Sequence, residues 1–151
     1  MNESSRRGAG TPRLSTAGEL SDAPGIPRLS ATNEDYLEAI FTLGGQSGMV
    51  RCVDLAVHLD VSKASVNRAV STLKQAGLVL QPHYGDLSLT EEGSHYAASI
   101  LERHIVLNRF LIDVLGVDEE VAHAEACLME HAISADTLQR LLVFVESYGT
   151  T

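Results

Sequence analysis

The sequence predicts a mainly α-helical protein in which a winged helix-turn-helix domain precedes an all-helical domain. Three observations lead to this fold class. Apolar residues recur three and four positions apart through most of the chain after residue 31. Two short apolar runs flank a glycine-containing turn near the middle, which is typical of a β-hairpin. Capping residues and glycines separate the periodic segments, and 151 residues suffice for one domain or two small ones.

Residues 1–31 differ in composition from the rest of the chain. They hold three of the four prolines, with scattered Gly, Ser and Thr and no apolar periodicity. We expect a disordered tail, although an extended or interacting arm would have the same composition. The predicted domains are therefore residues 32–92 and 93–151.

The first predicted domain contains three helices and a hairpin. Thr32 or Asn33 can cap its first helix, and Ser62 can cap its third. The predicted helices cover residues 32–43, 53–59 and 62–75, and the predicted strands cover 78–80 and 87–89.

The second predicted domain contains helices only. A long helix opens at Thr90 and ends between Val114 and Gly116. A helix over 118–133 begins with three acids, where the helix dipole favours negative charge. Ser134 caps a last helix that ends near Glu146.

The order of elements in the first domain predicts DNA binding. A short helix, a tight turn, a capped helix and a hairpin follow one another, so residues 62–75 would form the recognition helix. Short polar and cationic side chains on its exposed face suit base edges and phosphates, and the hairpin tip would act as a wing. The residues expected to contact DNA are Ser62, Lys63, Ser65, Asn67, Arg68, Lys74 and Tyr84. An ordinary solvated helix face could carry the same charges, but the element order favours DNA.

The net charge of −9 argues at first against a nucleic-acid partner. The distribution matters more than the total. Residues 51–80 carry four Lys and Arg against two acids, whereas residues 91–146 carry eleven acids against three Arg. The recognition segment is therefore mildly basic and the second domain strongly acidic.

Near the carboxyl end, His123, Cys127, Glu130 and His131 fall on one stripe of the predicted helix. Upstream, Asp35 and Glu38 are also one helical turn apart. Taken singly, each has a structural explanation: the thiol as a small buried hydrophobe, the acids as helix-terminal charges. Together they are poor core material, and this mixture of ligands suits a first-row transition metal better than Ca²⁺ or Mg²⁺.

Signatures of common enzymes are missing. His123 and Glu125 match half of the zinc-deaminase motif, but no cysteine follows Cys127. The sequence has no H-E-x-x-H, no G-x-S-x-G and no phosphate-binding glycine loop. A metallohydrolase therefore has little support, and we expect a protein that is not an enzyme.

The chain shows neither an apolar run of membrane-spanning length nor the hydrophobic segment of a signal peptide. Its two cysteines are too few for a disulfide framework and fit a reducing compartment. We expect a cytoplasmic protein without a membrane partner.

Several runs, taken in order along residues 32–146, resemble one known family. They are Asn33-Glu-Asp-Tyr-Leu-Glu-Ala-Ile40, Ser62-Lys-Ala-Ser-Val-Asn-Arg68, Leu89-Thr-x-x-Gly93, Glu102-Arg-His104 and Ala126-Cys-x-x-Glu-His131. Together these runs resemble the diphtheria-toxin-repressor family of metal-dependent transcriptional regulators, in particular its short two-domain manganese transport regulators. The resemblance implies a winged-helix domain, a helical dimerisation domain, and metal bound where the two meet. It also implies a homodimer that binds a palindromic operator in double-stranded DNA.

The resemblance also implies a ligand set, and this set combines two branches of the family. Asp35 and Glu38 resemble the manganese-sensing branch, whereas Cys127 resembles the iron-sensing branch. His104, Glu130 and His131 match both branches, and His123 matches an ancillary-site histidine of the iron branch. At Asn108 the iron branch has Glu instead.

The implied cofactor is accordingly Mn²⁺ or Fe²⁺. The implied function is a metal-dependent repressor of metal-ion homeostasis genes. The alternative is a metal-independent winged-helix regulator whose metal site is vestigial.

Overall fold

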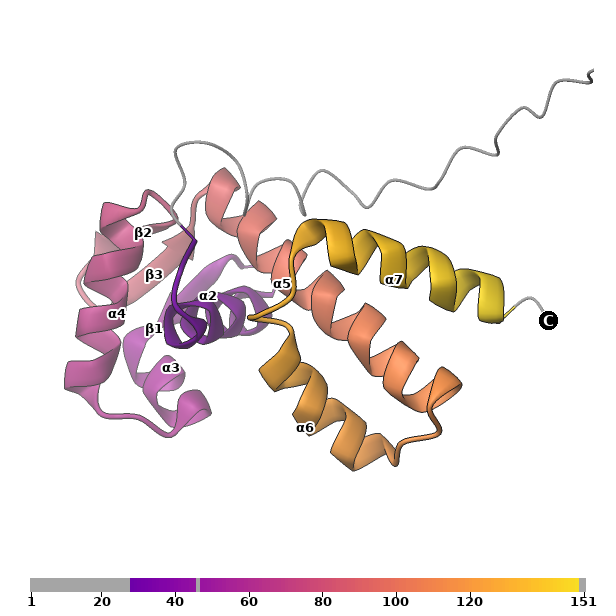
Figure 1. The fold of residues 1–151 in the computed structure, drawn as a ribbon. Coiled ribbons are helices and arrows are strands. Elements are labelled where there is room, and N and C mark those ends of the chain that lie inside the picture. The colour runs from indigo at the N-terminus through magenta and orange to yellow at the C-terminus, as the bar shows by residue number, and fades with distance from the viewer. Residues whose placement is uncertain (1–27, 46, 150–151) are drawn as a thin grey trace, which may run out of the picture.

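The computed structural model describes residues 28–45 and 47–149, so most of the predicted tail, residues 1–27, lies outside the described residues. Helices α2 to α4 and a small sheet gather at one end of the molecule, and α6 and α7 lie toward the other (Figure 1). Helix α5 runs between the two groups. The fold class predicted from the sequence, a winged helix-turn-helix followed by helices, is confirmed.

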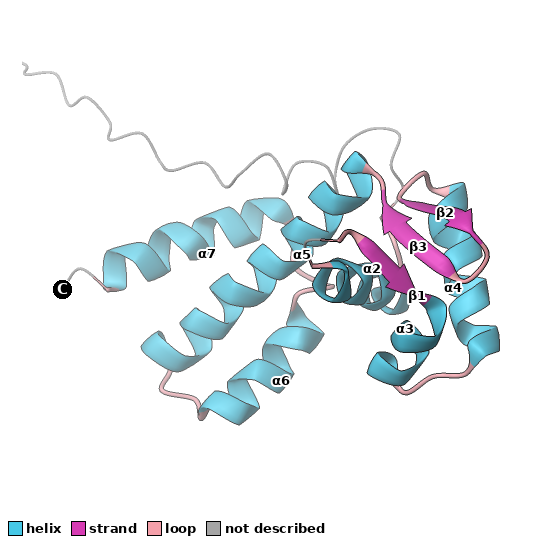
Figure 2. Ribbon diagram, turned by 180° about the vertical axis from the view of Figure 1, so that it is seen from behind, coloured by secondary structure: helices cyan, strands magenta, loops and turns pink. Residues whose placement is uncertain are grey.

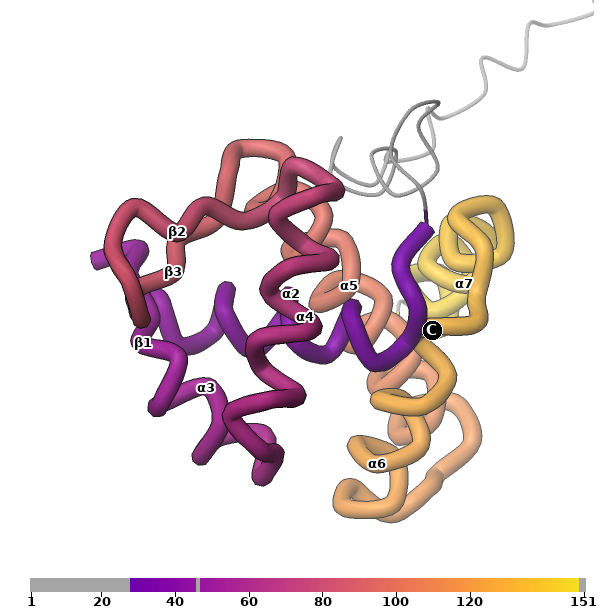
Figure 3. The backbone as a smooth tube through the Cα atoms, turned by 90° about the vertical axis from the view of Figure 1, so that its left-hand side faces the viewer, coloured from indigo at the N-terminus to yellow at the C-terminus, as the bar shows by residue number. Residues whose placement is uncertain are grey.

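The first domain has six elements. They are α2 (Ala31–Gly44), β1 (Met49–Arg51), α3 (Cys52–Leu59), α4 (Lys63–Gln75), β2 (Val79–His83) and β3 (Asp86–Leu89). Helix α2 packs against α3, α4 and α5, and the tube in Figure 3 shows it passing through the centre of the domain. The core of this domain therefore forms around α2.

The recognition helix α4 begins and ends as the sequence predicts. Ser62 is its N-cap, and the side-chain oxygen accepts a hydrogen bond from the amide of Ser65. The buried face consists of Val66, Ala69, Val70 and Leu73. The opposite, polar face is therefore left to solvent.

The sheet contains a strand that the sequence did not predict. The strand order is β1-β3-β2, all antiparallel, and Val50 of β1 pairs with Leu87 of β3 (Figure 2). β1 is only three residues long, which is too short for an alternating pattern to be recognised. It anchors the hairpin β2–β3 to the start of α3.

Helix α2 starts earlier than predicted. Its N-cap is Ser30, whose side chain accepts from the amide of Asn33, and not Thr32 or Asn33. Leu29 is buried in the core, and its amide donates to the hydroxyl of Tyr96 at 3.1 Å. The ordered chain therefore begins before residue 32.

Helix α5 (Glu91–Arg109) contributes to the cores of both domains. Its first half packs Tyr96 and Ile100 into the core around α2. Its last turn places Leu107 in the core of the second domain, together with Ala126 of α6 and with Leu111, which follows the end of α5. The predicted long helix does reach Val114, but its last five residues, Phe110–Val114, form a π-helical segment, η1.

No helix in the described part of the chain is long and apolar enough to cross a bilayer.

Helix α6 (Glu119–Met129) ends four residues earlier than predicted. Arginine side chains take up backbone carbonyls that a longer helix would have used. Arg103 donates to the carbonyl of Glu130 at 3.3 Å, and Arg28 donates to the carbonyls of His131 and Ile133 at 3.0 and 3.2 Å. Glu130 and His131 therefore lie where the chain turns toward α7 (Ala135–Tyr148), not on the helical stripe.

Gly93 fixes the position of α5 on the first domain. A Cβ atom at this position would overlap the carbonyl oxygen of Leu78, so no side chain fits without backbone movement. Gly93→Ala should reduce the free energy of unfolding by about 1–3 kcal/mol or more, because overpacking against backbone cannot relax. Urea denaturation of the purified variant measures this change.

Gly44→Ala is the matched control, because its Cβ would meet only the side chain of Val50 at an ordinary 3.6 Å. It should leave stability unchanged or raise it by about 0.5–1 kcal/mol. Equal stabilities of the two variants would contradict the close contact.

Candidate metal centre and DNA-binding surface

The exposed face of α4 presents most of the residues predicted to contact DNA. Five of these residues are exposed: Ser62 at the cap and, on the helix, Lys63, Asn67, Arg68 and Lys74. Ser65 is partly buried; its hydroxyl lies 2.9 Å from that of Ser62 and accepts from Arg68 at 3.3 Å. Ser65 therefore orients a cation of this surface.

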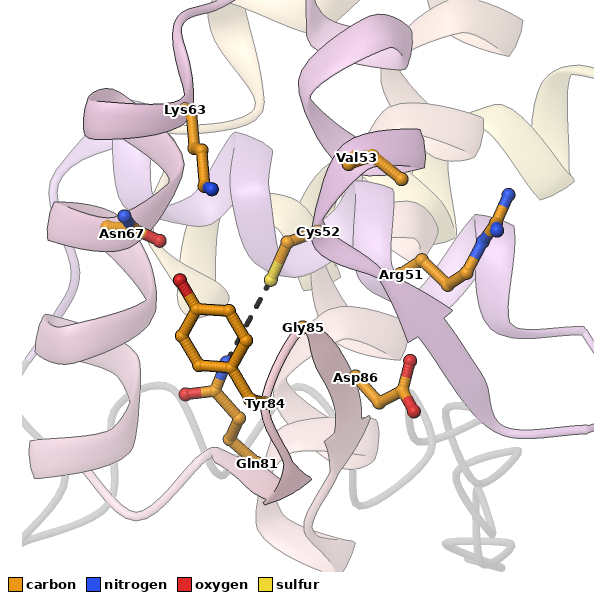
Figure 4. A pocket seen from close by; sticks show the side chains of 9 residues that line it. All are labelled: Arg51, Cys52, Val53, Lys63, Asn67, Gln81, Tyr84, Gly85 and Asp86. Carbon is orange, nitrogen blue, oxygen red and sulfur yellow. Dashed lines mark hydrogen bonds between the residues drawn. The ribbon is translucent and has the colours of Figure 1, made fainter.

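The wing lies beside α4 and extends this surface. Tyr84 is 92% exposed in the turn between β2 and β3. Lys74 donates to Gln81 of β2 at 3.4 Å, which ties the recognition helix to the wing. A pocket of about 230 Å³ separates them, with Lys63, Asn67 and Tyr84 at its rim and Cys52 on its wall (Figure 4).

Arg51 of β1 borders the same pocket and was not among the predicted DNA contacts. Its exposed guanidinium pairs with Asp54 at 3.0 Å. The only available sequence signal was its place directly before α3. With β1 unpredicted, nothing indicated that this side chain would lie near the wing.

The predicted metal ligands come together at the junction of the two domains. They come from α2, α5, α6 and the turn after α6. Within this region two trios each have one ligand atom per residue within 4.8 Å of the others: Asp35, Glu130 and His131, and His104, His123 and Cys127.

The first trio is rich in carboxylates. His131 Nε2 lies 2.8 Å from Asp35 Oδ1 and 3.6 Å from Glu130 Oε1. Glu38, one turn after Asp35 on α2, shares a side-chain hydrogen bond with Glu130. Glu130 is 1% exposed, whereas the side chain of Asp35 is 54% exposed, so the group opens to solvent on the side of α2.

The second trio combines two imidazoles and a thiol. His104 Nε2 lies 3.0 Å from His123 Nδ1, and Cys127 Sγ lies 3.7 Å from His104 Nδ1. The same Nδ1 atom lies 2.9 Å from Glu130 Oε2, so His104 connects the two trios. All seven predicted ligands thus belong to one continuous cluster, with His123 at its exposed edge.

The electrostatics of this cluster are dominated by buried carboxylates that lie close to one another. Burial, followed by the neighbouring Glu38 and Asp35, raises the pKa of Glu130 to about 9. Burial also raises the pKa of Glu38, which can bond to Glu130 only by sharing a proton with it. Both raised pKa values have the same physical cause, which is the burial of acids close to one another.

Burial also shifts the pKa values of the imidazole and thiol donors, His104 and Cys127. Burial, helped by His123, lowers the pKa of His104, so its imidazole is neutral near pH 7. Burial and Glu130 raise the pKa of the Cys127 thiol. Imidazole, thiol and carboxylate donors at these distances fit a first-row divalent metal, which would supply the charge that the acids lack.

Glu34 belongs to the junction and was missed by the sequence reasoning. It is fully buried and contacts Arg103 and His131. Its position three residues before the buried Leu37 was an available signal, because this spacing places both on one helix face. Asn108, one turn after His104, has a buried side-chain oxygen without a hydrogen-bond partner among the described residues.

Comparison with known proteins gives two family matches that together follow the domain order. Residues 28–87 match the model of the iron dependent repressor N-terminal DNA binding domain. Residues 90–150 match the model of the iron dependent repressor metal binding and dimerisation domain. The boundary between the two matches falls at the start of α5.

Two curated relatives have similar sequences. The transcriptional regulator MntR of Salmonella typhimurium is 36% identical over 118 residues, 78% of this chain and 74% of MntR. The iron-dependent repressor IdeR of Mycobacterium bovis is 35% identical over 120 residues, 80% of this chain but only 52% of IdeR. The chain therefore spans about half the length of IdeR.

Among solved structures, the manganese regulator SloR superposes with a TM-score of 0.68 at 29% identity. The superposition covers 76% of this chain and 53% of SloR, so here too the match spans about half of the longer protein. These comparisons agree with one another: two domain models match in order, one relative is covered over most of its length, and a solved structure has the same fold. The chain belongs to the diphtheria-toxin-repressor, or iron-dependent-repressor, family of metal-dependent transcriptional regulators.

Proposed function

We propose that this chain is a repressor that holds Mn²⁺ or Fe²⁺ between its two domains and, as a homodimer, binds a palindromic operator to control genes of metal-ion homeostasis. In this proposal residues 32–92 bind DNA and residues 93–151 bind metal and dimerise. It would act in the cytoplasm. One observation carries the proposal: candidate ligands from both domains lie side by side, Asp35 and Glu38 from one and Glu130 and His131 from the other.

The ligands connect two parts of the chain that are far apart in sequence. Asp35 and Glu38 lie on α2, which also supports α4, so their position is tied to that of the recognition helix. Glu130 and His131 lie in the turn that leads from α6 to α7. A bound dication would neutralise these acids and favour the arrangement in which both sets of ligands meet.

The identity of the metal rests on two opposing features. Asp35, Glu38 and Glu130 offer oxygen donors, which suit Mn²⁺. Cys127 offers a softer donor, which suits Fe²⁺ better. One similar protein is described as a manganese regulator and another as an iron-dependent repressor, in line with either ion.

Exposed apolar side chains on the second domain support a homodimer. Leu115 is 58% exposed, Phe144 is 48% exposed and Tyr148 is 49% exposed. The ring of Phe144 contacts those of Phe110 and Tyr148, which makes a contiguous apolar surface. A second copy of the chain would cover it, as expected for a domain matched as a dimerisation domain.

Metal should control DNA binding. With a duplex selected from a random library by the Mn²⁺-loaded protein, affinity should rise roughly 5–150-fold on adding Mn²⁺ or anaerobic Fe²⁺, the usual range of coupling between two sites. Fluorescence anisotropy in chelator and in each metal measures it, with Ca²⁺ as the control. Equal affinity in chelator would instead support the metal-independent regulator.

Arg68 should contribute through phosphate. Arg68→Ala should weaken binding to all duplexes and reduce the slope of log affinity against log salt by about 1, since one fewer counterion is released. Arg109→Ala, which removes an exposed cation of α5 outside the DNA-binding surface, is the control. An unchanged salt slope for Arg68→Ala would remove this residue from the interface.

Glu130 should make the metal-free protein sensitive to pH. Its pKa is about 9 when folded against an ordinary 4.5, so the folded state binds the proton more tightly. The resulting stability is fully present below pH 4.5 and is lost as pH rises through 9. Glu130→Gln has no such proton to lose.

In thermal unfolding from pH 5 to 9, the Tm of metal-free Glu130→Gln should therefore rise relative to wild type as pH increases. The variant should also lose most of the stabilisation that Mn²⁺ gives to wild type. Glu125→Gln, an exposed acid on α6, should behave as wild type in both respects. A constant Tm difference across this pH range would argue against a protonated Glu130.

A further inference from the structure

We propose that Glu34 is a positioning residue for metal binding: it orients His131 from the opposite domain so that one ring nitrogen is free to act as a ligand. The inference rests on the proposed metal site but concerns a side chain that is not itself among the predicted ligands. Glu34 is fully buried on α2, next to the ligand Asp35.

Both carboxylate oxygens of Glu34 have defined partners. Oε2 lies 3.3 Å from His131 Nδ1 and accepts from Arg103 at 3.4 Å. Oε1 accepts from the hydroxyl of Tyr96 at 3.3 Å and lies 4.0 Å from the guanidinium of Arg28. These partners come from α5, from the segment before α2 and from the turn after α6, so Glu34 is the point where they meet.

The charge of Glu34 is compensated within the network. The side chain of Arg103 is 4% exposed and that of Arg28 is 36% exposed. A buried carboxylate needs such partners, because an isolated charge in the interior is very costly. Glu34 is thus paired with cations of the protein itself, whereas Glu130 and Glu38 face each other.

Paired in this way, Glu34 acts on His131 as a hydrogen-bond acceptor. A carboxylate oxygen accepts hydrogen bonds, so Nδ1 of His131 is the ring nitrogen that donates to Glu34. Nε2 is then the ring nitrogen on the side of Asp35 and Glu130, at 2.8 and 3.6 Å, and is the one that would bind the metal. Carboxylate–histidine pairs of this kind fix ring orientation and raise the basicity of the ligating nitrogen.

The same network holds the backbone of the ligand turn. Arg103 bonds both to Glu34 and to the carbonyl of Glu130, and Arg28 bonds to the carbonyl of His131. Glu34 therefore positions a ligand side chain directly and its backbone through two arginines. Loss of its charge should loosen the ligands of the second domain while leaving each of them chemically intact.

The test compares Glu34→Gln with wild type in three measurements. Affinity for Mn²⁺, determined by calorimetric titration, should fall roughly 10–100-fold, as is typical when the partner of a ligating histidine is removed. In long-range ¹H–¹⁵N spectra of the Zn²⁺-loaded protein, the Nδ1–H signal of His131 should be present in wild type and shifted or broadened in the variant. Circular dichroism reports whether the variant is folded.

Two further variants separate positioning from simple destabilisation. Glu102→Gln removes a partly buried acid from the neighbouring position of α5, where burial raises the pKa of the carboxyl, and this variant should bind Mn²⁺ as wild type does. Tyr96→Phe keeps the charge of Glu34 but removes one of its hydrogen bonds, and should weaken Mn²⁺ binding by only about 2–10-fold. If Glu34→Gln does not fold, wild-type affinity and an unchanged His131 signal in Tyr96→Phe would overturn the assignment.

If Glu34→Gln folds, binds Mn²⁺ with wild-type affinity and shows an unchanged His131 signal, the role assigned to Glu34 is overturned but the proposed function is not. A wild-type protein that binds neither Mn²⁺ nor Fe²⁺ would overturn the proposed function, and the assignment with it. The two failures are thus distinguished by the behaviour of the wild-type protein.

Discussion

Buried carboxylates at the junction of the two domains are neutralised unequally, and much of the structure depends on this imbalance. Glu34 has two guanidinium partners, from Arg103 and Arg28. Glu130 and Glu38 have each other, and burial raises the pKa of both. Because desolvation penalises every uncompensated charge, the second group is stable only with protons or a cation between its members. One side of the junction is therefore neutralised by arginines of the protein itself. The other side is neutralised only when protons or a cation are bound there.

The two kinds of neutralisation join the domains in different ways. The network around Arg103 and Arg28 connects α2, α5 and the turn after α6 through groups of the protein itself. The acidic side then needs only small movements to gather or release its ligands. Because the candidate ligands lie close together, an ion would need to order little of the chain in order to bind.

Part of this arrangement could be predicted from the sequence, and the reasons differ by residue. The recognition helix was predictable because Ser62 is a strong cap and its four buried residues follow helical spacing. That Asp35 and Glu38 lie close to His131 could be predicted only from the resemblance to a family. Their segments are almost a hundred residues apart, so neither segment on its own indicates the contact. The end of α6 was not predictable, because it is set by Arg28 and Arg103, which reach it from elsewhere in the fold. Glu34 was overlooked although its spacing from Leu37 places it on the buried face of α2, because its counter-charges lie on α5 and before α2 and cannot be read from the sequence around it.

Helix α5 has a mechanical consequence. Its 19 residues correspond to a rod about 28 Å long, since a helix rises about 1.5 Å per residue. At Gly93 one end of the rod lies against the backbone of Leu78, so this end cannot slide on the wing. A rotation of about 5° about the Gly93 end would move the other end of the rod by about 2.5 Å. A small change in how α5 sits on the first domain would therefore produce its largest displacement in the second domain, where α6 and η1 pack against the helix.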